Sequence, residues 1–159
     1  MRFGEATKRV LTSEYLALAF RLYIGAIFIY ASMNKINYAA EFSETIASYQ
    51  LVPFWAVNLL AVMMPWAELI CGILLITGIK SKSATAVLGI MLTIFSAAIF
   101  FSLLRNIPIG CGCFSSVEEP MSWTTLLRDV VWLAMSVHIY FFDSTLQLDK
   151  RFLISLKDI

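Results

Sequence analysis

The sequence has few charged residues. Of its 159 residues, 14% are charged and 60% are hydrophobic, whereas a soluble domain usually has about 25% charged and about 45–50% apolar residues. One small water-facing domain cannot bury that many apolar side chains, so the composition argues against a soluble enzyme and against a disordered chain. The net charge of +1 also provides no basic surface for a nucleic-acid backbone.

Residues that mark metal sites and irregular segments are scarce too. Seven Gly and four Pro occur without a low-complexity tract, and a chain of this length is expected to form one domain. The single histidine, His138, has no cysteine or carboxylate at ligand spacing. We therefore expect His138 to be a packed, hydrogen-bonded core residue, and we assign no metal site.

The sequence has instead four long apolar runs, at residues 15–36, 55–79, 84–104 and 123–142. Each is close to the roughly 20 residues that an α-helix needs to cross a bilayer, and too long for a strand of a membrane barrel. Backbone groups in lipid must find partners within their own segment, so the runs should be helices. We predict an all-α integral membrane four-helix bundle, a single domain over residues 1–159. The first run follows a polar stretch and contains Arg21, so we expect a retained helix and no cleaved signal peptide.

Basic residues in the connecting segments predict the orientation. Eight of them fall on the side of the two termini and of the turn between the second and third runs, whereas two fall on the opposite side. Since Lys and Arg accumulate on the cytoplasmic side, both termini should be cytoplasmic. The eight are Arg2, Lys8, Arg9, Lys80, Lys82, Lys150, Arg151 and Lys157, and the two are Lys35 and Arg105.

Charged residues inside the runs are the next signal, because such residues are rare in membrane helices and usually face the bundle interior. From their estimated depths, we predict that Arg21 pairs with Glu68, either to fix helix packing or as part of a ligand site that includes Lys35. Lys35 and Arg105 lie near helix ends, where a long side chain can reach the membrane surface.

Arg128 and Asp129 are neighbours near the start of the fourth run. Adjacent helical residues do not face each other, so each is expected to find a partner elsewhere. They are interpreted either as a polar floor beneath the outer loop or as a membrane-surface Arg beside a helix-start Asp.

The outer loop between the third and fourth runs contains Cys111-Gly112-Cys113. Disulfides persist on the oxidising side of a membrane, and Gly112 permits the bend that so small a ring requires. Nearby Arg105 and Arg128 would favour the thiolate. We predict a redox-active dithiol, in which Cys111, Cys113, Arg105, Arg128 and Asp129 are the candidate catalytic residues. A structural loop disulfide, a soft-metal site for Cu(I) and unpaired cysteines are the alternatives.

Short motifs in a fixed order resemble the MauE branch of the DoxX-like membrane proteins. They are Arg21 with Gly25, Lys35-Ile36, Tyr49-Gln50-Leu51-Val52-Pro53, Pro65-Trp66-Ala67-Glu68-Leu69, Cys111-Gly112-Cys113-Phe114 and Leu127-Arg128-Asp129. The resemblance implies a four-helix protein of the bacterial inner membrane, with a periplasmic thioredoxin-like or sulfur-carrying partner. The bundle is also similar to those of vitamin K epoxide reductase and the bacterial disulfide-generating membrane proteins, which makes a quinone a candidate cofactor.

Two functions from different classes follow. The first is a membrane thiol–disulfide oxidoreductase that exchanges electrons between the Cys-Gly-Cys pair and its partner protein. The second is a non-enzymatic membrane anchor or assembly subunit for the maturation of a periplasmic redox or sulfur-metabolising complex. A homo-oligomer is compatible with both.

Overall fold

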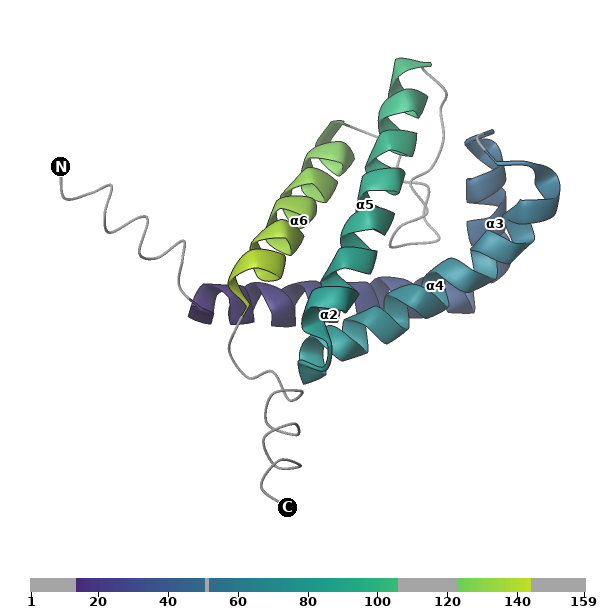
Figure 1. Cartoon of the computed structure of the whole chain (residues 1–159). Coiled ribbons are helices and arrows are strands. Elements are labelled where there is room, and N and C mark those ends of the chain that lie inside the picture. The colour runs from purple at the N-terminus through teal and green to yellow at the C-terminus, as the bar shows by residue number, and fades with distance from the viewer. Residues whose placement is uncertain (1–13, 51, 106–122, 144–159) are drawn as a thin grey trace.

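A computed structural model describes residues 14–50, 52–105 and 123–143 of the protein. These residues form helices and contain no strand, as Figure 1 shows. The helices are α2 (Glu14–Asn37), α3 (Ala39–Ser48), α4 (Phe54–Thr77), α5 (Ser81–Leu104) and α6 (Trp123–Phe142). Four of them, all but α3, are long and apolar enough to cross a membrane. The prediction of an all-helical membrane protein with four spans is confirmed.

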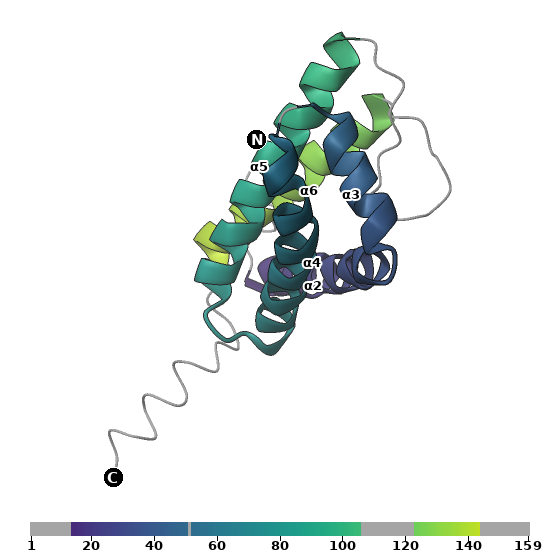
Figure 2. The same ribbon diagram turned by 90° about the vertical axis from the view of Figure 1, so that its right-hand side faces the viewer.

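The helices pack as two inclined pairs. α2 packs along α4, and α5 packs along α6, while α5 and α6 stand at a steep angle to α2 (Figures 1 and 2). We call the side of the molecule where α2 and α5 end and α4 and α6 begin the α3 side. The opposite side, where α6 ends, is called the Asp143 side.

Glycine permits the close approach of α2 and α4. A Cβ atom added to Gly25 would lie 3.1 Å from the backbone oxygen of Gly72, and one added to Gly72 would lie 3.0 Å from the oxygen of Gly25. Small residues at such a crossing let two helix backbones meet, which is the usual way membrane helices gain packing contacts. The two helices therefore cross at this glycine pair.

The turn between α4 and α5 determines where α4 ends and where α5 begins. Gly78 adopts a left-handed conformation with φ 75°, and its N–H donates to the carbonyl of Leu74, which is a common way to terminate a helix. α4 therefore stops at Thr77, two residues before the predicted end. α5 begins at Ser81, three residues before the predicted start.

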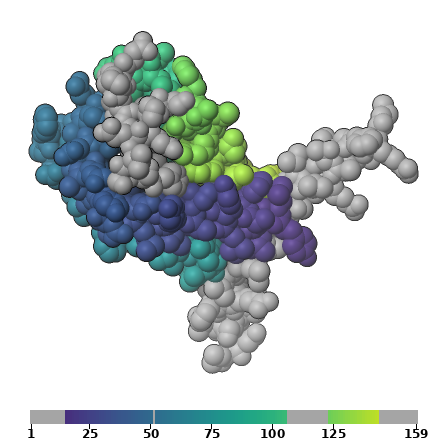
Figure 3. Space-filling view, turned by 180° about the vertical axis from the view of Figure 1, so that it is seen from behind, coloured from purple at the N-terminus to yellow at the C-terminus, as the bar shows by residue number. Residues whose placement is uncertain are grey.

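The sequence did not predict α3. The gap between the first two apolar runs, residues 37–54, indicates a connecting loop, yet Ala39–Ser48 is helical. Phe42 and Ile46, four residues apart, are buried against Val57 and Ala61 of α4, whereas Glu41 and Glu44 are exposed. The helix is too short to cross a membrane, and it is held by one apolar face. Figure 3 shows from behind that α2 and α3 form a continuous surface along one side.

A candidate functional site in a buried polar cavity

Lys35 of α2 and Glu68 of α4 form an ion pair inside the bundle. The Lys35 Nζ atom donates to both carboxylate oxygens of Glu68, at 2.7 and 2.8 Å. Both side chains are less than a tenth exposed. The ammonium group also lies 5.2 Å from the ring centre of Phe42 and 5.8 Å from that of Phe95, where aromatic faces attract a cation. Lys35 is therefore a buried partner of Glu68, and the expectation that it reaches the membrane surface is wrong.

The predicted pairing of Arg21 with Glu68 is also wrong. Arg21 precedes Gly25 by four residues, and Glu68 precedes Gly72 by four residues, on helices that run in opposite directions and cross at these glycines. At 1.5 Å per residue, this places Arg21 and Glu68 about 12 Å apart along the bundle, on opposite sides of the crossing. Helical side chains also lean toward their own N-terminus, so Arg21 and Glu68 lean apart, whereas Lys35 and Glu68 lean together.

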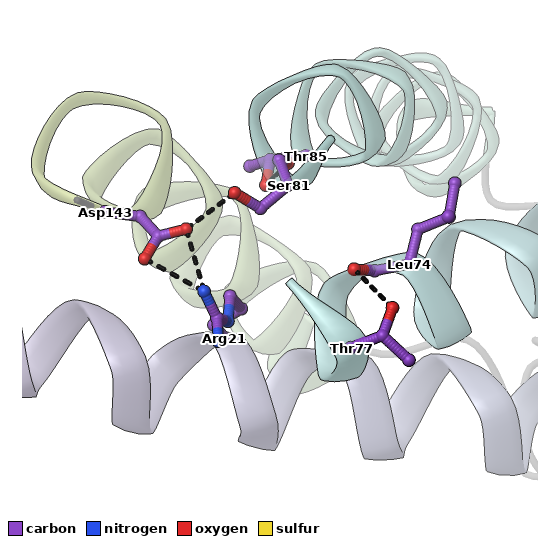
Figure 4. Close-up of polar contacts among 6 residues, drawn as sticks. All are labelled: Arg21, Leu74, Thr77, Ser81, Thr85 and Asp143. Atoms are coloured by element: carbon purple, nitrogen blue, oxygen red, sulfur yellow. Dashed lines mark hydrogen bonds and ion pairs between the residues drawn. The ribbon is translucent and has the colours of Figure 1, made fainter. Parts of the chain in front are cut away.

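Arg21 is bound instead on the Asp143 side, as the close-up in Figure 4 shows. Its Nη1 atom lies 3.2 Å from each carboxylate oxygen of Asp143. The hydroxyl of Ser81 donates to the same carboxylate at 2.7 Å, and the Thr85 hydroxyl donates to the Ser81 carbonyl. We call Arg21, Ser81 and Asp143 the clasp. It joins α2, the start of α5 and the residue that follows α6.

Asp129 is the third buried charged residue on the α3 side. Its side chain is 2% exposed, and one carboxylate oxygen lies 3.5 Å from Nε of Arg128, which is long for a charge-assisted hydrogen bond. The Arg128 guanidinium is partly exposed and lies 4.8 Å from the ring centre of Trp132. The two neighbours do contact each other, contrary to expectation, but only weakly.

A cavity of about 40 Å³ connects these groups. Its polar lining consists of Lys35, Glu68 and Asp129, from α2, α4 and α6, and its apolar lining includes Phe95 and Trp132. Residues that the sequence assigned to two separate sites thus face one space. The volume suffices for a few water molecules, since one water needs about 10–15 Å³ measured this way.

Tyr49, at the end of α3, is a residue of this region that sequence reasoning missed. It is buried, it packs edge-on against Phe95 with ring centres 6.1 Å apart, and its hydroxyl has no hydrogen-bond partner among the described residues. Burial, and then the nearby negative charge of Asp129, raise the pKa of Tyr49 above its ordinary value. The hydroxyl therefore remains a proton-bearing donor at neutral pH. The spacing of Phe42, Ile46 and Tyr49 along one helical face could have revealed it.

The remaining predicted site residues are distributed as follows. Cys111 and Cys113 lie outside the described residues. Arg105 is exposed at the end of α5. His138 is packed between the rings of Phe20 and Phe142, with centres 5.3 and 4.8 Å away, which agrees with a packed histidine.

An open hollow of about 360 Å³ lies between α5 and α6. The hydroxyl groups of Thr85, Thr93 and Ser136 line it, and each donates to a carbonyl four residues earlier in its own helix. With these hydroxyls satisfied, the hollow is an apolar surface of the kind that lipid chains cover.

The family of the chain follows from its comparison with known sequences. A family model described as methylamine utilisation protein MauE matches residues 13–142, a segment that contains all the helices described above. The chain belongs to the MauE family. The resemblance deduced from the short motifs is confirmed, and the four long helices make this MauE-family chain a multi-pass membrane protein.

Several curated relatives carry the name methylamine utilization protein MauE. The protein of Paracoccus denitrificans is 28% identical over 76% of the chain and 66% of its own length. That of Paracoccus versutus is 29% identical over 82% of the chain and 71% of its own length, and that of Methylophilus methylotrophus is 29% identical over 74% and 64%. The chain thus spans about two thirds of the length of these relatives. No solved structure matches it.

Proposed function

We propose that this MauE-family protein is a thiol–disulfide redox protein of the bacterial inner membrane. In this proposal the Cys111-Gly112-Cys113 pair exchanges electrons with a thioredoxin-like or sulfur-carrying protein on the outer side. One observation carries the proposal: the segment with the two cysteines joins α5 to α6 on the same side as the buried Lys35–Glu68–Asp129 cavity. Cys111 and Cys113, one residue apart in the sequence, belong to the connection between these two helix ends.

The exchange is balanced without any further reagent. The Cys111 thiolate attacks a disulfide of the partner protein, and a mixed disulfide forms while one partner thiolate leaves. Cys113, deprotonated, then attacks the Cys111 sulfur and releases the second partner thiolate. The Cys-Gly-Cys pair ends as a disulfide and the partner as a dithiol. Arg105 and Arg128 are proposed to favour the thiolate form.

The proposed orientation places this pair on the extracytoplasmic side of the inner membrane, with both termini and the Lys80–Lys82 turn in the cytoplasm. The eight-to-two distribution of basic residues supports it. In a cysteine-free background, an impermeant thiol reagent added to intact cells should label a probe at position 118 and spare one at position 82. The reverse pattern would exclude an outer Cys pair.

A quinone does not fit the cavity. A cavity of about 150 Å³ is of the size that takes up a single benzene ring, whereas the space between Lys35, Glu68 and Asp129 measures about 40 Å³. No step of the proposed exchange runs through a quinone.

The names of the relatives favour a second candidate function. They are methylamine utilization proteins, so the chain is proposed alternatively to be a membrane assembly subunit for a periplasmic redox protein of that process. In that case the cysteine pair would be structural or unused.

Trapping of the mixed disulfide tests the first function against the second. Cys71 is buried and is first replaced by Ser, so that the Cys111–Cys113 pair is the chain's only source of thiols. In that background, Cys113→Ser should accumulate a mixed disulfide with the partner protein, because the resolving thiol of Cys113 is gone. A reductant should cleave this mixed disulfide. Cys111→Ser is the matched control and should trap less.

A redox titration completes the test. Structural disulfides have potentials below about −300 mV, so a reversible pair should titrate at a higher potential. A midpoint below that value, together with no trapped partner in either variant, would leave the assembly function as the remaining candidate.

A further inference from the structure

The two carboxylates of the α3-side cavity are unequally satisfied. Glu68 receives two short hydrogen bonds from Lys35, at 2.7 and 2.8 Å. Among the described residues, Asp129 receives one contact, at 3.5 Å from Arg128. Burial disfavours a charge that lacks partners, so Asp129 is the less well satisfied of the two carboxylates in the part of the chain that the structure describes.

The hydrogen-bond inventory of the cavity indicates water. An ammonium group has three N–H donors, and Glu68 accepts two from Lys35. The Tyr49 hydroxyl, buried close to Asp129, has no partner in the described part of the chain. Buried polar groups are normally paired with protein or ordered water, and a cavity of about 40 Å³ can hold water molecules that bridge Lys35, Glu68 and Asp129, which line it.

We infer that this cavity is a hydrated proton-binding site within the membrane domain, in which the Asp129 carboxylate takes up and releases the proton. Bound water links the carboxylate to Lys35, which lines the same cavity. The ligand is the proton itself, and one carboxylate oxygen gains an O–H bond when the site fills. The site requires no reaction at Cys111 or Cys113, and so it stands apart from the proposed redox function.

Charged and titratable groups face Asp129 from each neighbouring element. Lys35 comes from α2, Glu68 from α4, Arg128 from α6 itself and Tyr49 from the end of α3, while α5 contributes apolar side chains such as Phe95 and Leu92. The positive charges of Lys35 and Arg128 stabilise a carboxylate anion at this position, whereas burial among apolar side chains disfavours it. This opposition makes proton exchange at Asp129 sensitive to each of its neighbours.

Infrared difference spectroscopy tests the inference on the full chain in lipid nanodiscs. A protonated carboxyl group has a C=O stretching band separate from that of a carboxylate, and this band should rise and fall reversibly with pH. We expect Asp129→Asn to remove one component of the band and Asp129→Glu to retain that component at a shifted frequency, which distinguishes loss of the group from loss of the fold. Exposed carboxyl groups such as Glu41 and Glu44 give components that all the variants share. Glu44→Gln is the control, because Glu44 is exposed on α3 and its replacement leaves the buried ion pairs intact, so the Asp129 component should persist in it.

A second change examines the role of the neighbouring pair. In Glu68→Gln, Lys35 loses its carboxylate partner and can turn toward Asp129, so the band should weaken at any given pH. Identical titrating carboxyl bands in wild type and in a folded Asp129→Asn variant would overturn the inference. The same spectra of a Cys111→Ser, Cys113→Ser variant should match wild type, so failure of the redox function and failure of the proton site are distinguishable.

Discussion

The clasp and the α3-side cavity use similar charged groups in opposite ways. In the clasp, the Asp143 carboxylate receives hydrogen bonds from Arg21 and Ser81, on two different elements. In the cavity, the Asp129 carboxylate receives one long contact, from its own neighbour, within the part of the chain that the structure describes, and it borders the cavity. A carboxylate whose oxygens accept hydrogen bonds from several elements holds those elements together. A carboxylate that borders a cavity can instead exchange a proton or bind water. We therefore interpret the clasp as structural and the cavity as functional.

The largest effect should come from breaking the clasp. Asp143→Ala leaves the buried Arg21 guanidinium without its carboxylate, and loss of one partner of a buried ion pair typically costs about 3–5 kcal/mol of unfolding free energy. Unfolding in detergent, followed by circular dichroism, measures the cost. The double variant Arg21→Gln, Asp143→Asn should recover part of it. Additive losses would mean that the two groups are not coupled.

Breaking the Lys35–Glu68 pair should cost less. In Lys35→Gln the Glu68 carboxylate keeps access to the cavity, where water can replace the lost donor, so we expect a loss of about 2 kcal/mol, in the range for hydrogen bonds to charged groups. The same unfolding measurement applies. A loss as large as that of Asp143→Ala would indicate a dry cavity and would remove the contrast between the two clusters.

The glycine crossing lies between the clasp and the cavity and should respond to one added methyl group. In Gly72→Ala the new Cβ would meet the Gly25 backbone oxygen at 3.0 Å, and overpacking of this kind costs about 1–3 kcal/mol. Gly89→Ala is the matched control, since its Cβ would meet nothing within 4 Å. That variant should be neutral or slightly stabilising. Equal effects at both glycines would contradict a close crossing of α2 and α4.

The smallest effect concerns pH at Tyr49. Its pKa in the folded protein is raised by burial and by Asp129, whereas an unfolded tyrosine ionises near about pH 10. The folded state therefore holds the Tyr49 proton more tightly than the unfolded state does. The contribution of Tyr49 to the free energy of unfolding is present below that pH and is lost as the pH rises above it. In Tyr49→Phe, the free energy of unfolding should depend less on pH in the alkaline range than it does in the wild type. Tyr38→Phe, at an exposed tyrosine before α3, is the control and should leave the profile unchanged.

The sequence by itself determined the class of the protein. Four apolar runs of membrane length leave a helix as the only way to satisfy backbone groups in lipid, and motifs such as Pro65-Trp66-Ala67-Glu68-Leu69 were enough to indicate the MauE family. It also identified the internal charges, because any charge in such a run is conspicuous. These features are local, since hydropathy and motif order do not depend on how the helices meet.

Only the tertiary structure decided which charges meet. Depth estimated from each run by itself paired Arg21 with Glu68, but the Gly25–Gly72 crossing sets the register of α2 against α4 and brings Lys35 to Glu68 instead. Asp143 lay beyond the last apolar run, and its partner is 122 residues away in the chain. Register between helices depends on a few small residues and on the direction in which long side chains lean, and neither is visible in the hydropathy of a single helix.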